Sequence, residues 1–187
     1  MRIAITGGIA EGKSTVLGYL ADFGYSTASG DEFAREVFSD PAVQTRLSQL
    51  LGREPPVSAS ALREALRDSI GTRRAVNRIM HAPVAAKIAA CPATFIEVPL
   101  LIETCLQPAF DAVWVVTCGP EEQLRRLVQR YGEDTANELV DYQLSATAKM
   151  PFGDVIVRTN YLPDTVKCFV KQAAETMLSS WIARNQG

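Results

Sequence analysis

The chain has 187 residues, of which 47% are hydrophobic and 21% charged, and its formal net charge is −2. This length favours one compact globular domain with small insertions, and the small net charge gives no reason to expect nucleic acid or an anionic membrane as a partner. A single histidine and four cysteines without a CxxC pair argue against a His/Cys zinc site. No apolar run approaches eighteen residues and no basic segment precedes a long apolar core, so we expect a cytoplasmic protein.

The N-terminal part alternates between strand and helix patterns. Residues 2–6 form a short apolar run that ends in Gly7-Gly8 and predicts a buried strand, and residues 13–23 have the apolar spacing of a helix. Residues 25–28 predict a second strand, with another helix starting at residues 29–31. A β-α-β beginning of this kind predicts a parallel sheet with a right-handed crossover.

The middle of the chain, residues 32–91, has helical patterns throughout. Asp40-Pro41 predicts a helix start, because proline is tolerated in the first turn. Residues 52–57 predict a loop, and Ser58 and Ser60 are candidate caps for the helix that follows. Gly71-Thr72 is expected to separate that helix from the next one. A helical insertion after the second strand predicts a substrate-binding lobe.

Three further strands and two helices are expected in the remainder. The candidate strands are residues 93–99, 112–118 and 155–157, and the candidate helices start at Gly119-Pro120 and at Pro163. Strands that alternate with helices predict an α/β fold with a doubly wound parallel sheet, which binds ligands beyond the carboxyl ends of its strands. We expect a core of residues 1–31, 92–120 and 153–187, an acceptor lobe of residues 32–91 and a lid region of residues 121–152.

Residues 7–14, GGIAEGKS, match the phosphate-binding pattern G-x-x-x-x-G-K-[ST]. The glycines allow successive N–H groups to point inward around a phosphate, and the following helix adds its positive end. Lys13 is expected to reach the β- and γ-phosphates of a nucleotide, and Ser14 to place its hydroxyl on Mg²⁺. Because a carboxylate beside a polyphosphate is unfavourable, we expect the Glu11 side chain to point outward.

Other features separate a kinase from other proteins with such a loop. A switch GTPase would need an N-K-x-D motif, which the chain lacks, and a motor ATPase usually carries an acidic pair where Glu97 stands alone. The short length and the helical insertion favour a kinase of small molecules. A kinase of another nucleoside or nucleotide, and a nucleotide-binding regulator without catalysis, stay open as alternatives.

The loop and three further segments together resemble the dephospho-coenzyme A kinase family. The loop looks like that family's G-G-I-x-x-G-K-S-T start, although Ala10 and Glu11 replace smaller residues. Residues 29–37, SGDEFAREV, are similar to its D-A-D-x-I-A-R-x-V segment, and residues 97–103, EVPLLIE, to its D-V-P-L-L-F-E segment. Residues 123–127, QLRRL, also fall in family order. The resemblance implies an adenylate-kinase-like P-loop fold and phosphorylation of the ribose 3′-hydroxyl of dephospho-coenzyme A, the last step of coenzyme A synthesis.

Transfer of a phosphoryl group to a neutral hydroxyl requires a carboxylate that orients the hydroxyl and accepts its proton. Asp31 is our candidate, since it follows the second strand and lies in a segment that carries the resemblance; a helix N-cap is the alternative. Arg126 and Arg130 are four residues apart on one helix face and could close on the transferring phosphate as lid residues, or form surface salt bridges.

The remaining candidates each have two interpretations. Arg35 either holds acceptor phosphates or pairs with Glu32, and Lys149 either contacts substrate or is a surface charge. The resemblance places His81 at the acceptor, whereas a lone histidine is more often structural. The expected catalytic residues are Asp31, Lys13 and Arg126, and the expected acceptor contacts are Asp31, Arg35, His81 and Lys149. The expected nucleotide contacts are Gly8, Ile9, Ala10, Glu11, Gly12, Lys13, Ser14, Thr15 and Arg130. We expect ATP with Mg²⁺ as cofactors, dephospho-coenzyme A as substrate, and a monomer or weak homo-oligomer.

Overall fold

The computed structural model describes residues 1–141 and 143–185 and divides into two compact units. The first unit joins residues 1–29 to residues 92–187, and the second comprises residues 30–91. The chain leaves the first unit directly after one strand and returns to it just before the next. The second unit is therefore an insertion between two strands of the first.

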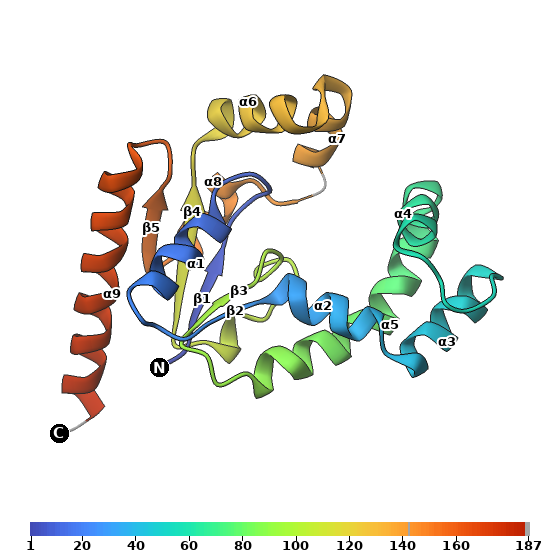
Figure 1. The fold of residues 1–187 in the computed structure, drawn as a ribbon, viewed down its shortest axis with the longest axis horizontal. Coiled ribbons are helices and arrows are strands. Elements are labelled where there is room, and N and C mark those ends of the chain that lie inside the picture. The colour runs from blue at the N-terminus through green and yellow to red at the C-terminus, as the bar shows by residue number, and fades with distance from the viewer. Residues whose placement is uncertain (142, 186–187) are drawn as a thin grey trace. The chain divides into compact units, whose positions relative to one another are not determined.

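A five-stranded parallel sheet forms the centre of the first unit (Figure 1). Its strands are β1 (Ile3–Thr6), β2 (Thr27–Ser29), β3 (Phe95–Glu97), β4 (Ala112–Thr117) and β5 (Val155–Arg158). They lie in the order β2-β3-β1-β4-β5, and all of these strands pair in parallel. Parallel pairing brings the carboxyl ends of the strands to one edge, where sheets of this kind bind ligands. The predicted α/β fold with a parallel sheet is confirmed.

The helices of the first unit connect and flank these strands. They are α1 (Lys13–Asp22), α6 (Pro120–Tyr131), α7 (Glu133–Asp141), α8 (Ala146–Lys149) and α9 (Pro163–Asn185), with short 3-10 turns η1 (Gln107–Ala109) and η2 (Met150–Phe152). The start of α6 agrees with its sequence: Pro120 has no N–H to leave unpaired, and Glu121 and Glu122 occupy the first turn, where the helix dipole favours acidic side chains.

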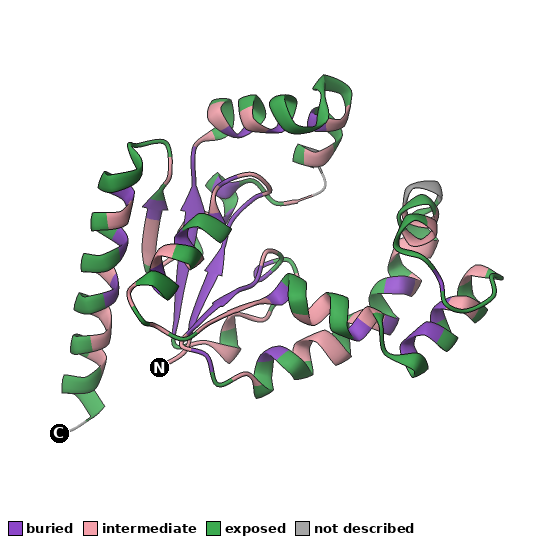
Figure 2. Cartoon of the chain, in the orientation of Figure 1, coloured by how far each residue is buried: buried purple, intermediate pink, exposed green. Residues whose placement is uncertain are grey.

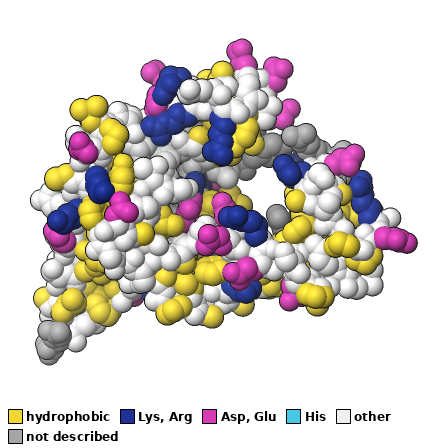
Figure 3. Space-filling model, in the orientation of Figure 1, with side chains coloured by type: hydrophobic (Ala, Val, Ile, Leu, Met, Phe, Trp, Pro, Cys, Tyr) yellow, Lys and Arg dark blue, Asp and Glu magenta, His cyan; other side chains and the backbone are white. Residues whose placement is uncertain are grey.

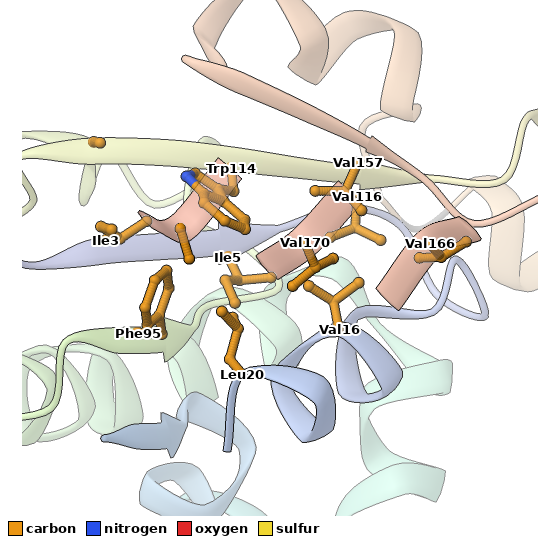
Figure 4. Close-up of a cluster of buried hydrophobic side chains, with 12 residues drawn as sticks. Ile3, Ile5, Val16, Leu20, Phe95, Trp114, Val116, Val157, Val166 and Val170 are labelled. Atoms are coloured by element: carbon orange, nitrogen blue, oxygen red, sulfur yellow. The ribbon is translucent and has the colours of Figure 1, made fainter. Parts of the chain in front are cut away.

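The core of the first unit lies between the sheet and helices α1 and α9 (Figure 4). Phe95 and Trp114 are fully buried in it, with ring centroids 5.3 Å apart in an edge-to-face arrangement. An aromatic pair of this geometry contributes about 0.5–1.5 kcal/mol beyond its buried area. All six residues of β4 are buried, as Figure 2 shows for most of the sheet. Burial on both faces explains why the first five residues of β4 are apolar instead of alternating.

Four helices make up the second unit. They are α2 (Gly30–Phe38), α3 (Pro41–Leu51), α4 (Ala59–Asp68) and α5 (Ile70–Ala90). One core cluster of this unit consists of Val37, Val43, Leu47, Val76 and Ile79 from the helices and Val57 from the loop before α4. The helix start predicted at Asp40-Pro41 is confirmed, and the Asp40 carboxylate accepts from the backbone N–H of Ala42 at 2.8 Å. Of the two candidate serines, Ser58 caps α4, since its hydroxyl accepts from the N–H of Ala61 at 3.1 Å, whereas Ser60 lies inside the helix.

The expected break at Gly71-Thr72 is wrong, because Ser69 separates α4 from α5. Ser69 has an extended backbone, with φ −155° and ψ 134°, and its hydroxyl caps α5. The hydroxyl accepts from the N–H of Gly71 at 3.1 Å and from that of Thr72 at 3.3 Å. A serine cap satisfies N–H groups that the first turn leaves unpaired, so Gly71 and Thr72 begin the helix instead of ending one.

The two longest helices, α5 and α9, carry charged residues along their length. No helix in the described part of the chain is long and apolar enough to cross a bilayer.

Candidate active site

Residues 7–12 form a loop between the carboxyl end of β1 and the first turn of α1. Gly12 precedes the helix with φ 93°, in the left-handed region that favours glycine. Ala10 has φ 60° and occupies left-handed backbone although it carries a Cβ. The first turn of α1 follows, and its unpaired N–H groups and dipole favour an anion. The strand, loop and helix expected around a phosphate site are therefore present.

Four consecutive carbonyl groups of this loop accept hydrogen bonds from side chains. The pairs are Lys13 Nζ with the Gly8 carbonyl (2.8 Å), Gln123 Nε2 with Ile9 (2.9 Å), Arg126 Nη1 with Ala10 (3.3 Å) and Thr159 Oγ1 with Glu11 (2.6 Å). The first donor is the first residue of α1, two come from α6, and the fourth directly follows β5. The loop is thus held at successive residues by parts of the chain that are distant in sequence.

Lys13, Ser14 and Thr15 form the first turn of α1. Lys13 is 8% exposed, whereas Ser14 and Thr15 are exposed. No cluster of three or more His, Cys, Asp or Glu side chains suited to a metal occurs among the residues that the structure describes. A Mg²⁺ ion that arrives with a nucleotide takes most of its oxygen ligands from phosphates and water, so a single exposed hydroxyl such as that of Ser14 fits such an ion.

The expectation that the Glu11 side chain points outward is wrong, because Glu11 is only 1% exposed. Its Oε2 accepts from the Gly8 N–H at 3.4 Å. Burial raises the pKa of Glu11, and the bond from Gly8 and the charges of Lys13 and Lys149 oppose that rise without cancelling it. The interior beneath the loop supplies cations and a hydroxyl, that of Thr117, as partners for the carboxylate.

Arg126 joins the loop to the segment after β5. Its Nη1 also donates to Thr159 Oγ1 at 3.3 Å, and its Nη2 donates to the Thr159 carbonyl at 2.8 Å. Glu122 orients this guanidinium by accepting from its Nε at 2.8 Å. Hydrogen bonds from Arg125 and Arg126 lower the pKa of Glu122 to about 2, so the carboxylate stays charged at any physiological pH. Figure 3 shows basic and acidic side chains together over α6.

Arg130 and Lys149 lie in different surroundings from the loop. The Arg130 guanidinium lies over the Tyr131 ring, 5.2 Å from its centroid. Lys149 is fully buried, and its Nζ contacts Glu103 Oε1 and donates to the Pro99 carbonyl, each at 2.9 Å. The alternative that Lys149 is a surface charge is therefore wrong. Its ammonium lies close enough to Glu11 to lower the pKa of that carboxyl.

The other candidates belong to the second unit. Asp31 and Arg35 are exposed on successive turns of α2, and Arg35 Nε donates to the Asp31 carbonyl at 3.2 Å. Asp31 is the second residue of α2 and follows the end of β2 by two positions. His81 is exposed on α5, a helix that is tied to α2 by an ion pair between Lys87 and Glu36 at 2.7 Å.

Gln123 and Thr159 were not identified as site residues from the sequence. A weak signal was available for Gln123, since it lies three residues before Arg126 and so shares its helix face. No local signal exists for Thr159, because its role depends on β5 lying beside β4 in the sheet.

Residues 1–164 match the family profile described as dephospho-CoA kinase. The dephospho-CoA kinase of Streptococcus mutans is 30% identical over 191 residues, which cover 88% of this chain and 91% of that protein. The dephospho-CoA kinase of Escherichia coli K12 is 29% identical over 180 residues, covering 88% and 86%.

Solved structures of lower identity share the fold. A protein from Thermus thermophilus superposes with a TM-score of 0.76 at 21% identity, covering 96% of this chain and 97% of that one. Dephospho-CoA kinase from Campylobacter jejuni gives 0.61 at 18%, covering 94% and 96%, and shikimate kinase from Aquifex aeolicus gives 0.56 at 16%, also covering 94% and 96%. Because the family profile spans most of the sequence and includes the phosphate-binding loop, the chain belongs to the dephospho-CoA kinase family.

Proposed function

We propose that this protein transfers the γ-phosphoryl group of ATP to the ribose 3′-hydroxyl of dephospho-coenzyme A, the last step of coenzyme A synthesis. The observation that carries the proposal is a phosphate-binding loop with bonded carbonyl groups, in a chain that matches the family over residues 1–164. A loop of this kind binds phosphate but does not specify an acceptor. Family membership supplies the acceptor.

A protein catalyses phosphoryl transfer mainly by placing positive charge around the phosphate and by aligning the reacting groups. We assign Lys13 to the β- and γ-phosphates. Arg126 is the proposed contact of the phosphoryl group in transfer, a role that requires its guanidinium to exchange bonds to Ala10 or Thr159 for phosphate oxygens. Ser14 would hold Mg²⁺, which when bound neutralises charge on the phosphate oxygens. Gly8 to Thr15 and Arg130 are the proposed nucleotide contacts.

Asp31 is the proposed general base. As the 3′-oxygen forms its bond to the γ-phosphorus, the bond from phosphorus to the β–γ bridging oxygen breaks, and the hydroxyl proton passes to the Asp31 carboxylate. Its exposure and its position just after β2 support this role. Arg35 and His81 are proposed acceptor contacts. Lys149 stays a predicted substrate contact, one that requires its ammonium to exchange Glu103 for a phosphate.

The test is an acceptor panel with Mg-ATP, read by ADP release and by mass spectrometry of the product. The panel holds dephospho-coenzyme A, adenosine, AMP, shikimate and gluconate. Turnover of dephospho-coenzyme A alone, with a mass gain of one phosphoryl group, supports the proposal. Turnover of another acceptor only, or ATP binding without turnover of any, overturns it.

A further inference from the structure

Three side chains hold the phosphate-binding loop on its carbonyl side. We infer that Gln123, Arg126 and Thr159 act as a carbonyl clamp, a set of donors that keeps loop residues 9–11 in the form that binds a polyphosphate. Gln123 and Thr159 are then positioning residues for the reaction, since they act through the loop. The inference depends on one part of the proposed function, namely that the loop binds a triphosphate.

Peptide geometry links the clamp to phosphate binding. In a trans peptide unit the C=O and the N–H of the next residue point in opposite directions. Pro55-Pro56 is the only cis peptide bond in the described part of the chain, so the loop is trans throughout. Fixing the carbonyls of residues 9–11 toward α6 and Thr159 therefore turns the N–H groups of residues 10–12 the other way. Donors fixed before an anion arrives need no reorganisation when it binds.

Gln123 lies close enough to the loop to act in this way. It lies in the first turn of α6 and is 9% exposed. Its amide fits against the loop so closely that a Cβ on Gly8 would lie 2.5 Å from Nε2. Gly7, Ala10 and Gly12 have positive φ, whereas Gly8 does not. The need for glycine at position 8 thus arises from the approach of Gln123.

Thr159 is fixed by the sheet. Its N–H donates to the Thr117 carbonyl at 2.8 Å, which continues the pairing of β5 with β4 by one residue. Its hydroxyl accepts from Arg126 Nη1 at 3.3 Å and donates to the Glu11 carbonyl at 2.6 Å. The Thr159 side chain also packs on Gly12, where a Cβ would meet its atoms at 3.0–3.2 Å. Through this hydroxyl, the sheet and Arg126 therefore fix the position of the loop.

Binding of inorganic tripolyphosphate, measured by titration calorimetry, tests the clamp without reference to the acceptor. Thr159→Val replaces the hydroxyl by a methyl group, which removes the bond to the Glu11 carbonyl and the one accepted from Arg126, and Gln123→Met removes the amide at similar length. A lost neutral hydrogen bond of this kind should weaken binding about three- to tenfold in each variant. Binding of ATP should weaken in the same way, which raises the KM for ATP and leaves the KM for the acceptor unchanged. Thr159→Ser keeps the hydroxyl and should recover most of the loss.

Matched controls separate the clamp from general effects of the substitutions. Thr45→Val removes an exposed hydroxyl that donates to the Pro41 carbonyl in α3, and Gln172→Met changes an exposed residue of α9. Both should bind tripolyphosphate as the unaltered protein does. Wild-type affinity in both Thr159→Val and Gln123→Met would overturn the inference, as would an equal loss in Thr159→Ser. If Thr159→Val fails to fold, the same titration of Gln123→Asn tests the inference, because the shorter side chain cannot reach the Ile9 carbonyl. An inactive acceptor panel alongside these losses would reject the proposed function and leave the clamp intact.

Discussion

Replacing Gly8 by alanine tests the closest contact between the loop and α6. The new Cβ would lie 2.5 Å from Gln123 Nε2, which falls 0.9 Å short of the 3.4 Å at which ordinary van der Waals contact begins. The obstructing atom is the end of a flexible side chain, so we expect the Gln123 amide to move while the loop backbone stays. A shift of that size takes the 2.9 Å bond from Gln123 to the Ile9 carbonyl beyond hydrogen-bonding distance.

The expected loss in ATP-binding free energy is the contribution of the lost hydrogen bond. A neutral intramolecular hydrogen bond contributes about 0.5–1.5 kcal/mol, and a loss of about 1 kcal/mol weakens ATP binding roughly fivefold. In a Gln123→Ala background the obstruction and the bond are both absent already. Gly8→Ala should then cost little more, which gives a coupling energy of about 1 kcal/mol in the double-mutant cycle.

Titration of ATP into the wild type, the two single variants and the double variant measures this coupling. Gly12→Ala is the control, because its φ of 93° strains any residue with a Cβ whether or not Gln123 is present. Its cost should be the same in both backgrounds. Additive effects of Gly8→Ala and Gln123→Ala, with no coupling, would refute the argument that Gln123 dictates the glycine at position 8.

Three further predictions concern the charged residues. Asp31→Asn should lower kcat by roughly a hundredfold, as loss of a general base does, and leave the ATP dissociation constant unchanged in a titration; equal activity would remove Asp31 from the mechanism. Burial raises the pKa of Glu11 above its ordinary value of 4.5. The protonated carboxyl therefore contributes stability that is fully present below pH 4.5 and is lost as the pH rises through the pKa of the folded state. Glu11→Gln should therefore gain in melting temperature over wild type as pH rises from 4.5 to 8, whereas Glu175→Gln on the exposed side of α9 should not. Lys149→Met leaves Glu103 without its buried partner and removes one of the two cations that act on Glu11, the other being Lys13. It should lower the free energy of unfolding by about 3 kcal/mol in urea titrations; a change below 1 kcal/mol would contradict the importance of this contact.

The elements of the fold were predictable because their signals are local. The apolar run of β4 and the start of α6 at Pro120 depend on residues that are adjacent in sequence. The break before α5 was misplaced because Gly71 was weighed by its helix propensity, whereas the capping hydroxyl of Ser69 decides the boundary.

The shape of the site was less predictable because its partners are distant in sequence. The outward orientation expected for Glu11 came from considering the ligand's charge alone. The Gly8 N–H and Lys13, both within the motif, favour the charged form of the buried Glu11, but so does Lys149, which lies more than a hundred residues further along the chain and is itself held by Glu103 and the Pro99 carbonyl. A pattern of eight residues carries no information about such a partner.

The motif and the clamp therefore contribute differently to phosphate binding. The sequence GGIAEGKS permits a tight loop, but Ala10 in left-handed backbone and a buried carboxylate at Glu11 both work against it. The bonds from Gln123, Arg126 and Thr159 fall on the carbonyls of these two residues and of Ile9, which precedes them. Tertiary contacts that hold a strained segment at successive residues are what such a segment requires to persist. The departure of this loop from its family's smaller residues is thus tolerable because α6 and the end of β5 fix its backbone from outside.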